Sequence, residues 1–297
     1  MAEGLRLISW SLLLAQVFNG LTLGALLVLV AMGLTIIFGA LGVVNFAHGS
    51  FYALGAYAGF VAYDKTHSFL AAMAAGALAL LVTGIVIERG LIRLYYNRPK
   101  EDQILVTFGV AIILVEALRT GFGGLAQALP VPSWGAGAVY LGLTYYPTYR
   151  VEVLGIVAAT LVVLYLVLYR TRLGLIVRAG IEDQLMVNML GINVTRTFLT
   201  VFGLGAMAAG FAGVINGPIV TVTPDMGADV LVQSFVVIVI GGVGSFWGAL
   251  VGGLIAGEIL SLTAMIKPAY SQVMLFAAMA LVLIFRPQGL FGVQGRQ

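Results

Sequence analysis

The sequence predicts an all-α fold, a polytopic transmembrane bundle of about eight or nine helical spans, some of them broken or re-entrant. Hydrophobic residues make up 61% of the 297 positions and only 9% are charged, whereas about a quarter of an ordinary soluble domain is charged. The mean hydropathy of +1.07 and the 39 glycines are typical of helices that lie in lipid. We therefore expect one transmembrane domain over residues 1–297, with little chain left for a separate soluble domain.

Nine apolar stretches are candidate spans, and they lie at residues 11–38, 50–63, 69–87, 104–122, 153–169, 198–219, 231–240, 247–262 and 273–285. The first is interpreted as a retained span, because no cleavage pattern follows it. Stretches 50–63, 231–240 and 247–262 are short and interrupted by glycine. Irregular backbone at membrane depth is tolerated only where it is buried in protein or lines a wet cavity. These three stretches are therefore the first place to look for a functional site.

Basic residues predict the orientation of the chain. The polar loops 88–102 and 170–196 hold eight of the fifteen basic residues, so the positive-inside rule assigns both loops to the cytoplasm. Loop 121–150 and segment 217–229 then lie outside, where they form either a shallow docking surface or plain connectors. Counting the crossings predicts an external N-terminus and a cytoplasmic C-terminus.

Several kinds of chemistry have no motif in this chain. It contains no GxxxxGK[ST] phosphate loop, no HExxH, no GxSxG, no cysteine and only two histidines, which argues against an enzyme, a metal site or ATP hydrolysis by this chain itself. The absence of TVGYG weakens the interpretation as a potassium-type channel. We expect no cofactor and no metal on this chain, and no nucleic-acid partner.

Three charged residues fall within apolar spans, where an isolated charge is costly. Glu116 and Arg119 are three positions apart, so they are expected to neutralise each other near the outer end of one helix. Glu258 has no such neighbour in the sequence. A proton-carrying role for Glu258 is one alternative, and a position at the outer interface or beside a polar group of the bundle is the other.

Two glycine-flanked polar breaks are the strongest site candidates. The first, at residues 39–50, contains Asn45, His48 and Ser50. A helix restarting near Ser50 would point its positive end into the protein, where it could receive a carboxylate. A tight turn capped by Asn45 is the alternative.

The second break, at residues 241–248, reads GGVGSFWG and repeats the order of a small polar residue, phenylalanine and glycine. Two matched breaks indicate an internal repeat with a pathway at its interface. The predicted pathway runs between the breaks, with polar contacts from Asn45, His48, Ser50 and Ser245, apolar gates at Phe46, Phe246 and Trp247, and Asn216 and Gln233 as secondary lining residues or helix-packing partners.

The chain resembles a known family at these residues and at two further segments. GVVNFAHGSFYALGAY at 42–57 and VIGGVGSFWGALVGG at 239–253 look like the first and last signatures of the permease subunits of bacterial ABC importers for branched-chain amino acids, a family that extends to urea and short amides. TRLGLIVRAGIEDQLMVNMLGINV at 171–194 resembles the family's cytoplasmic coupling segment, and IFRPQGLFG at 284–292 its tail. The first type of permease in the pair is the better match.

The resemblance implies a heterodimer with a second, related permease in the bacterial plasma (inner) membrane. It also implies two cytoplasmic ATPase subunits that hold ATP and Mg, and an external substrate-binding protein. Coupling to the ATPases would involve Arg178, Glu182, Asp183 and Gly191, on a short helix over 178–191 that lies in a partner's groove. A merely solvated loop is the alternative for this segment. Many relatives have Glu and Ala where this chain has Leu185 and Val187.

Few fixed charges along the pathway suit a small zwitterion with an apolar side chain, and branched-chain amino acids are the main prediction. The alternatives within the family are urea, short amides or aromatic acids. Those of another class are a proton-coupled carrier that uses Glu258 or His48, and a passive solute channel.

Overall fold

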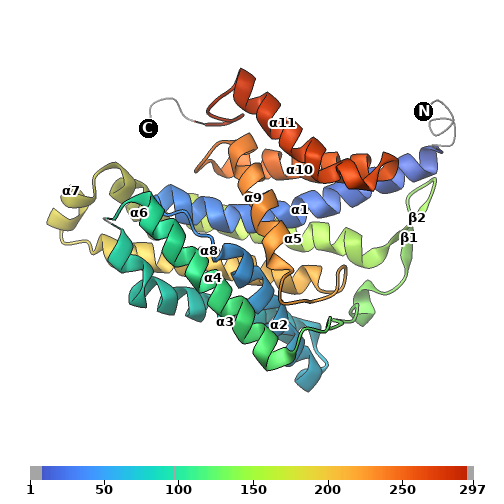
Figure 1. Cartoon of the computed structure of the whole chain (residues 1–297), viewed down its shortest axis with the longest axis horizontal. Coiled ribbons are helices and arrows are strands. Elements are labelled where there is room, and N and C mark those ends of the chain that lie inside the picture. The colour runs from blue at the N-terminus through green and yellow to red at the C-terminus, as the bar shows by residue number, and fades with distance from the viewer. Residues whose placement is uncertain (1–8, 97, 293–297) are drawn as a thin grey trace. The chain divides into compact units, whose positions relative to one another are not determined.

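The structure is a computed structural model that describes residues 9–96 and 98–292, and it is almost entirely helical (Figure 1). The notation η marks 3₁₀ helices. In chain order the helices are α1 (Trp10–Leu41), α2 (His48–Thr66), α3 (Phe69–Gly90), η2 (Ile92–Tyr95), α4 (Lys100–Phe122), η3 (Ser133–Gly135), α5 (Thr148–Arg170), α6 (Arg172–Glu182), α7 (Gln184–Met189), α8 (Val194–Asn216), α9 (Gly227–Gly241), α10 (Phe246–Ile266), η4 (Pro268–Tyr270) and α11 (Ser271–Phe285). Both chain termini lie outside the described residues.

The prediction of a helical membrane fold is confirmed. Within the described residues, seven helices are long and apolar enough to cross a membrane, and α9 is a shorter apolar helix. Loop 121–150 adds a small antiparallel hairpin of β1 (Ala138–Tyr140) and β2 (Tyr145–Pro147), in which Val139 pairs with Tyr146.

The prediction of short, glycine-interrupted pieces at 50–63 and 247–262 is wrong. Both stretches belong to continuous helices, α2 with 19 residues and α10 with 21. Their glycines serve close packing instead of chain breaks: a Cβ on Gly55 of α2 would overlap the backbone of Gly210 on α8. Such small residues let helix backbones approach closely in lipid.

Two compact units divide the chain. The first takes in the chain up to Ala31, Val131–Ala158 and the part from Gln233 onward, and the second takes in Met32–Pro130 and Ala159–Val232. Helices α1, α5 and α9 each contribute residues to both. A single domain over 1–297 stays a prediction.

The core of the second unit consists of α2, α3 and α8, which make extensive contacts with one another. Large side chains that are fully buried there include Phe51, Tyr52, Tyr57 and Phe202, and the Phe51 and Phe202 rings meet edge to face with 6.2 Å between centroids. This unit carries the first predicted break and both basic loops.

In the first unit, the N-terminal part of α1 packs closely on α10. A Cβ on Gly24 would come within 2.9 Å of the Gly253 carbonyl oxygen, and Ser261 of α10 donates a hydrogen bond to the Gln16 carbonyl at 2.7 Å. After α11 the chain returns to the end of α9, where the N–H groups of Leu290 and Phe291 donate to backbone carbonyls at 2.8 Å each.

The predicted helix over 178–191 is also wrong in its extent. Two helices, α6 and α7, occupy this segment and are separated at Asp183, whose backbone is extended. The Asp183 carboxylate accepts a hydrogen bond from the Met186 N–H at 2.9 Å. This side-chain bond replaces the helical one and begins a new helix, as expected of an N-cap residue.

Candidate functional site

A groove of about 400 Å³ lies in the second unit, between the start of α2, one face of α4 and the segment that enters α9. On α4 its lining residues run from Phe108 to Arg119, about 16 Å at the rise of an α-helix. One end of the groove meets the first predicted break, and the other carries charged side chains. The lining residues are Phe46, Gly49, Ser50, Phe108, Ala111, Ile112, Val115, Glu116, Arg119, Pro224, Asp225, Gly227, Ala228 and Leu231.

The break between α1 and α2 is a buried, hydrogen-bonded turn. Asn45 is 0% exposed, and its side-chain oxygen accepts a hydrogen bond from the Ala47 N–H at 3.0 Å. The Phe46 N–H donates to the Thr107 hydroxyl of α4 at 3.1 Å. The chain therefore makes a tight turn here, as the alternative predicted, but Asn45 bonds within the turn and Ala47 is the N-cap of α2, without a side-chain cap. Helix α4 holds this turn against one end of the groove.

Two of the residues predicted at this break line the groove, and two lie behind it. Phe46 and Ser50 are lining residues, and the Ser50 hydroxyl donates to the Ala111 carbonyl at 3.2 Å. His48 is 0% exposed and packs edge-on against the Phe51 ring. Asn45 and His48 thus belong to the packed wall that positions Phe46 and Ser50.

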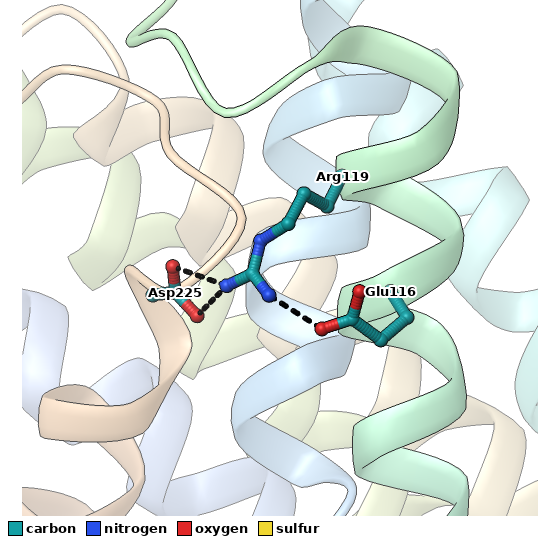
Figure 2. Close-up of polar contacts among 3 residues, drawn as sticks. All are labelled: Glu116, Arg119 and Asp225. Carbon is teal, nitrogen blue, oxygen red and sulfur yellow. Dashed lines mark hydrogen bonds and ion pairs between the residues drawn. The ribbon is translucent and has the colours of Figure 1, made fainter.

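The other end of the groove is an ion-pair cluster of Glu116, Arg119 and Asp225 (Figure 2). Arg119 donates through Nη1 to Glu116 at 2.5 Å and through Nη2 to both carboxylate oxygens of Asp225 at 3.0 Å. The predicted pair of Glu116 and Arg119 is confirmed. The guanidinium lies between two carboxylates, so the cluster offers both signs of charge to a ligand.

The role of Asp225 was missed at the sequence level. It is 106 positions from Arg119, and no local spacing links the two. The available signal was topological, because the positive-inside count places both residues on the outer side. A backbone bridge between Gln127 and Val222, with N–H to O distances of 2.8 and 2.9 Å, joins the segment that follows α4 to the one that precedes α9.

The secondary lining candidate Asn216 packs between helices and does not line the groove. Its Nδ2 donates to the Tyr52 hydroxyl at 2.5 Å, which ties α8 to α2. Gln233 is half-buried on α9. It belongs to the first unit and is not among the residues that line the groove.

The second predicted break lies in the first unit, between α9 and α10. Ser245 caps α10 by accepting a hydrogen bond from the Gly248 N–H at 3.0 Å. Phe246 is buried, Trp247 is 53% exposed, and their rings meet edge to face with 5.8 Å between centroids. The role of Ser245, Phe246 and Trp247 in a pathway between the two breaks stays a prediction.

The predicted coupling residues lie on or beside α6 and α7. Arg178 donates a hydrogen bond to the Leu168 carbonyl and lies over the Tyr169 ring, 5.4 Å from its centroid, so it holds α6 against the end of α5. Glu182 is the exposed last residue of α6, and Asp183 caps α7. Gly191 follows α7 with a left-handed backbone, φ +79°.

Helix α7 has an apolar surface that the sequence reasoning missed. Its Val187 is buried against Val194 and Phe198 of α8, while Leu185 is 72% and Met189 81% exposed. Leu185 thus adds to the exposed apolar face, and Val187 anchors the helix.

Glu258 of α10 lies against α1 in the first unit. A Cβ on Gly20 would come within 2.6 Å of the Glu258 carboxylate carbon, so this glycine makes room for the acid. Among the described residues, no group of three or more histidine, aspartate or glutamate side chains is placed to hold a metal ion.

The apolar helices of the described residues, seven of which are long enough to cross a membrane, are those of a multi-pass membrane protein. The family described as "Branched-chain amino acid transport system / permease component" matches residues 16–283. The chain belongs to this family and is a transport component.

Curated relatives agree with the family match. The chain is 32% identical to the high-affinity branched-chain amino acid transport system permease protein LivH of Salmonella typhimurium, over 94% of this chain and 95% of the relative. It is 32% identical to the permease protein BraD of Pseudomonas aeruginosa, with the same coverage. The permease protein LivM of Escherichia coli is 28% identical over 91% of this chain and 68% of the relative. No solved structure matches the chain.

Proposed function

We propose that this chain is a membrane-spanning permease subunit of an ATP-driven importer for branched-chain or other apolar amino acids, and that the groove of the second unit is part of its translocation pathway. The observation that carries the proposal is the pairing of a charged end with an apolar wall. Glu116, Arg119 and Asp225 form the charged end, and Ile112 and Leu231 contribute to the wall.

This arrangement suits the chemistry of a zwitterionic amino acid. Arg119 can receive the α-carboxylate through its planar fork of donors, and either neighbouring carboxylate can receive the α-ammonium. The apolar wall then accommodates an aliphatic side chain without holding it tightly. Phe46 and Ser50 stand at the far end of the groove, where Phe46 would act as an apolar gate and Ser50 as a polar contact.

The proposed assembly contains a second, related permease, because the chain matches both LivH and LivM relatives and is more similar to the first. Two cytoplasmic ATPase subunits would bind ATP and Mg and supply the energy, and an external binding protein would deliver the substrate. We place the complex in the bacterial inner membrane, with the N-terminus outside and the C-terminus in the cytoplasm. The apolar face of α7 supports docking into a groove of an ATPase subunit.

ATP-dependent uptake of leucine by the reconstituted complex tests the proposal. Arg119→Gln and Asp225→Asn should each lower uptake at least about tenfold while leaving the melting temperature nearly unchanged, since exposed ion pairs contribute little to stability. Lys65→Gln, which removes an exposed charge at the end of α2 outside the groove, is the matched control and should transport normally. Normal uptake by both groove variants would refute the pathway.

The same vesicles separate the alternatives. Uptake driven by a pH gradient without ATPase subunits would favour a proton-coupled carrier, for which Glu258 is the candidate group. Flux without ATP would favour a passive channel. If urea, short amides or aromatic acids inhibit leucine uptake competitively, the substrate assignment would change to one of these alternatives within the family.

A further inference from the structure

A second cavity, of about 500 Å³, lies in the second unit where the two basic segments meet. Arg89, in the last turn of α3, and Arg93 of η2 line it from one segment. Asn193, Arg196 and Thr200 line it from the start of α8. Neither the groove nor the coupling helices account for this concentration of arginines.

The cavity is built for an anion. It is lined by three guanidinium groups, and none of the described residues that line it is acidic. It also lies at the N-terminal end of a 23-residue helix, which carries positive partial charge. Arginine presents its donors in a planar fork that matches the oxygens of a phosphate group.

The carboxylate of Glu88 acts on this charge electrostatically. Glu88 interacts with Arg93, but it is buried and accepts a hydrogen bond from the Tyr96 hydroxyl. Burial raises the pKa of Tyr96 above its ordinary value, so this hydroxyl remains protonated and continues to donate. With Glu88 engaged by Tyr96 and no acid among the lining residues, the described lining of the cavity carries net positive charge.

An apolar stripe on α3 leads to the cavity. Leu78, Val82 and Val86 are spaced by four residues and are between 58% and 62% exposed, so they form one ridge along the helix. Arg89 follows Val86 by three positions and continues the same face. Because α3 is long and apolar enough to span a membrane, lipid chains can lie along this ridge and place their headgroup at the arginines.

We infer that this cavity binds the phosphate headgroup of an anionic phospholipid, with the acyl chains along the stripe of Leu78, Val82 and Val86. The positive-inside rule places the site in the cytoplasmic leaflet, where basic pockets between spanning helices meet anionic lipids. The stripe favours a lipid over a soluble phosphate or an acidic protein surface, because only a lipid has acyl chains that can pack along it.

Native mass spectrometry of the full chain in nanodiscs with phosphatidylglycerol and phosphatidylcholine tests the site. The wild type should retain phosphatidylglycerol preferentially. The triple variant R89Q/R93Q/R196Q should lose affinity for this lipid about tenfold or more, because one basic residue near an anionic headgroup contributes roughly fivefold. The control R98Q/K100Q/R172Q removes the same total charge from the same two loops outside the cavity and should lose less than about twofold.

A second variant guards against a folding defect in the triple variant. Thr200→Trp fills the cavity while every arginine remains, and it should also displace phosphatidylglycerol. If the cavity triple variant and the control triple variant lose affinity for phosphatidylglycerol equally, the lipid is held only by diffuse electrostatic attraction, and the proposed site is refuted. So would equal retention by wild type and cavity variants.

Two further outcomes would assign the arginines to another ligand. If inorganic phosphate stabilises the protein against heat as well as phosphatidylglycerol does, the cavity is a site for a free anion. If the triple variant keeps its lipid but no longer co-purifies with an ATPase subunit, the arginines serve a protein interface. Either result would refute the lipid assignment.

Discussion

Gly49 and Gly227 lie backbone against backbone, so a Cβ on either residue would overlap the carbonyl oxygen of the other. Gly49 is in the first turn of α2, and Gly227 is the first residue of α9. Both line the groove. This contact lets the start of α9 pack closely on the start of α2 and places both backbones in the groove wall.

Gly49→Ala should therefore destabilise the protein and lower transport. The added methyl group has nowhere to go without a backbone shift, and overpacking of this kind costs about 1–3 kcal/mol. The melting temperature in detergent and leucine uptake by the complex are the measurements. Gly109→Ala on α4, where a Cβ meets nothing within 4 Å, is the control and should be neutral or mildly stabilising. Equal melting temperatures for the two variants would contradict the contact.

Tyr52→Phe should weaken the link between α2 and α8. The variant removes the hydroxyl that accepts the hydrogen bond from Asn216. The buried Asn216 amide then loses this acceptor, at a cost of about 1–2 kcal/mol. Tyr145→Phe makes the same chemical change on an exposed ring of β2 and should not alter the melting temperature. Wild-type stability of the Tyr52 variant would show that this hydrogen bond contributes nothing.

Ser245→Ala should destabilise the start of α10. Loss of an N-cap side chain costs about 1 kcal/mol, and Ser245→Asp should retain most of the stability because its carboxylate can accept the same Gly248 N–H. Thermal unfolding of the two variants is the measurement. If alanine and aspartate behave alike, Ser245 serves the pathway or another role and not the helix start.

Gly191→Ala should alter coupling more than folding. A left-handed backbone costs a residue with a side chain about 1–2 kcal/mol, so the turn between α7 and α8 should shift. The ratio of substrate-stimulated ATP hydrolysis to uptake should rise in this variant, whereas Gly191→Asn should remain near wild type because asparagine tolerates this conformation. An unchanged ratio in Gly191→Ala would count against a coupling role. Gly90→Ala, at an open position without positive φ, is the control.

Much of the fold was predictable because hydropathy is a local property. The apolar composition of stretches 69–87 and 104–122 alone predicts the helices α3 and α4. The extent of the coupling helix was not predictable in the same way, because helix propensity over 178–191 competes with the capping hydrogen bond of Asp183. The glycines of α2 were taken as interruptions because sequence alone does not show that Gly210 lies opposite Gly55.

The candidate site was predictable only in part. The polar break at 39–50 correctly marked a chain interruption, yet it did not reveal that Asn45 and His48 face the interior while Phe46 and Ser50 face the groove. That division depends on Thr107 and Ala111 of α4, which bind the turn and the Ser50 hydroxyl from about sixty positions away.

The sequence by itself determined a helical membrane protein whose chain is interrupted at two places, since lipid demands apolar helices and glycine-rich polar strings end them locally. Its resemblance to a permease family rested on a few short signature strings. The tertiary structure alone decided that Arg119 pairs with Asp225 and that Arg89 and Arg196 share a cavity. Such pairs arise from how helices pack, and packing depends on the shape of whole helix faces, which no short stretch of residues contains.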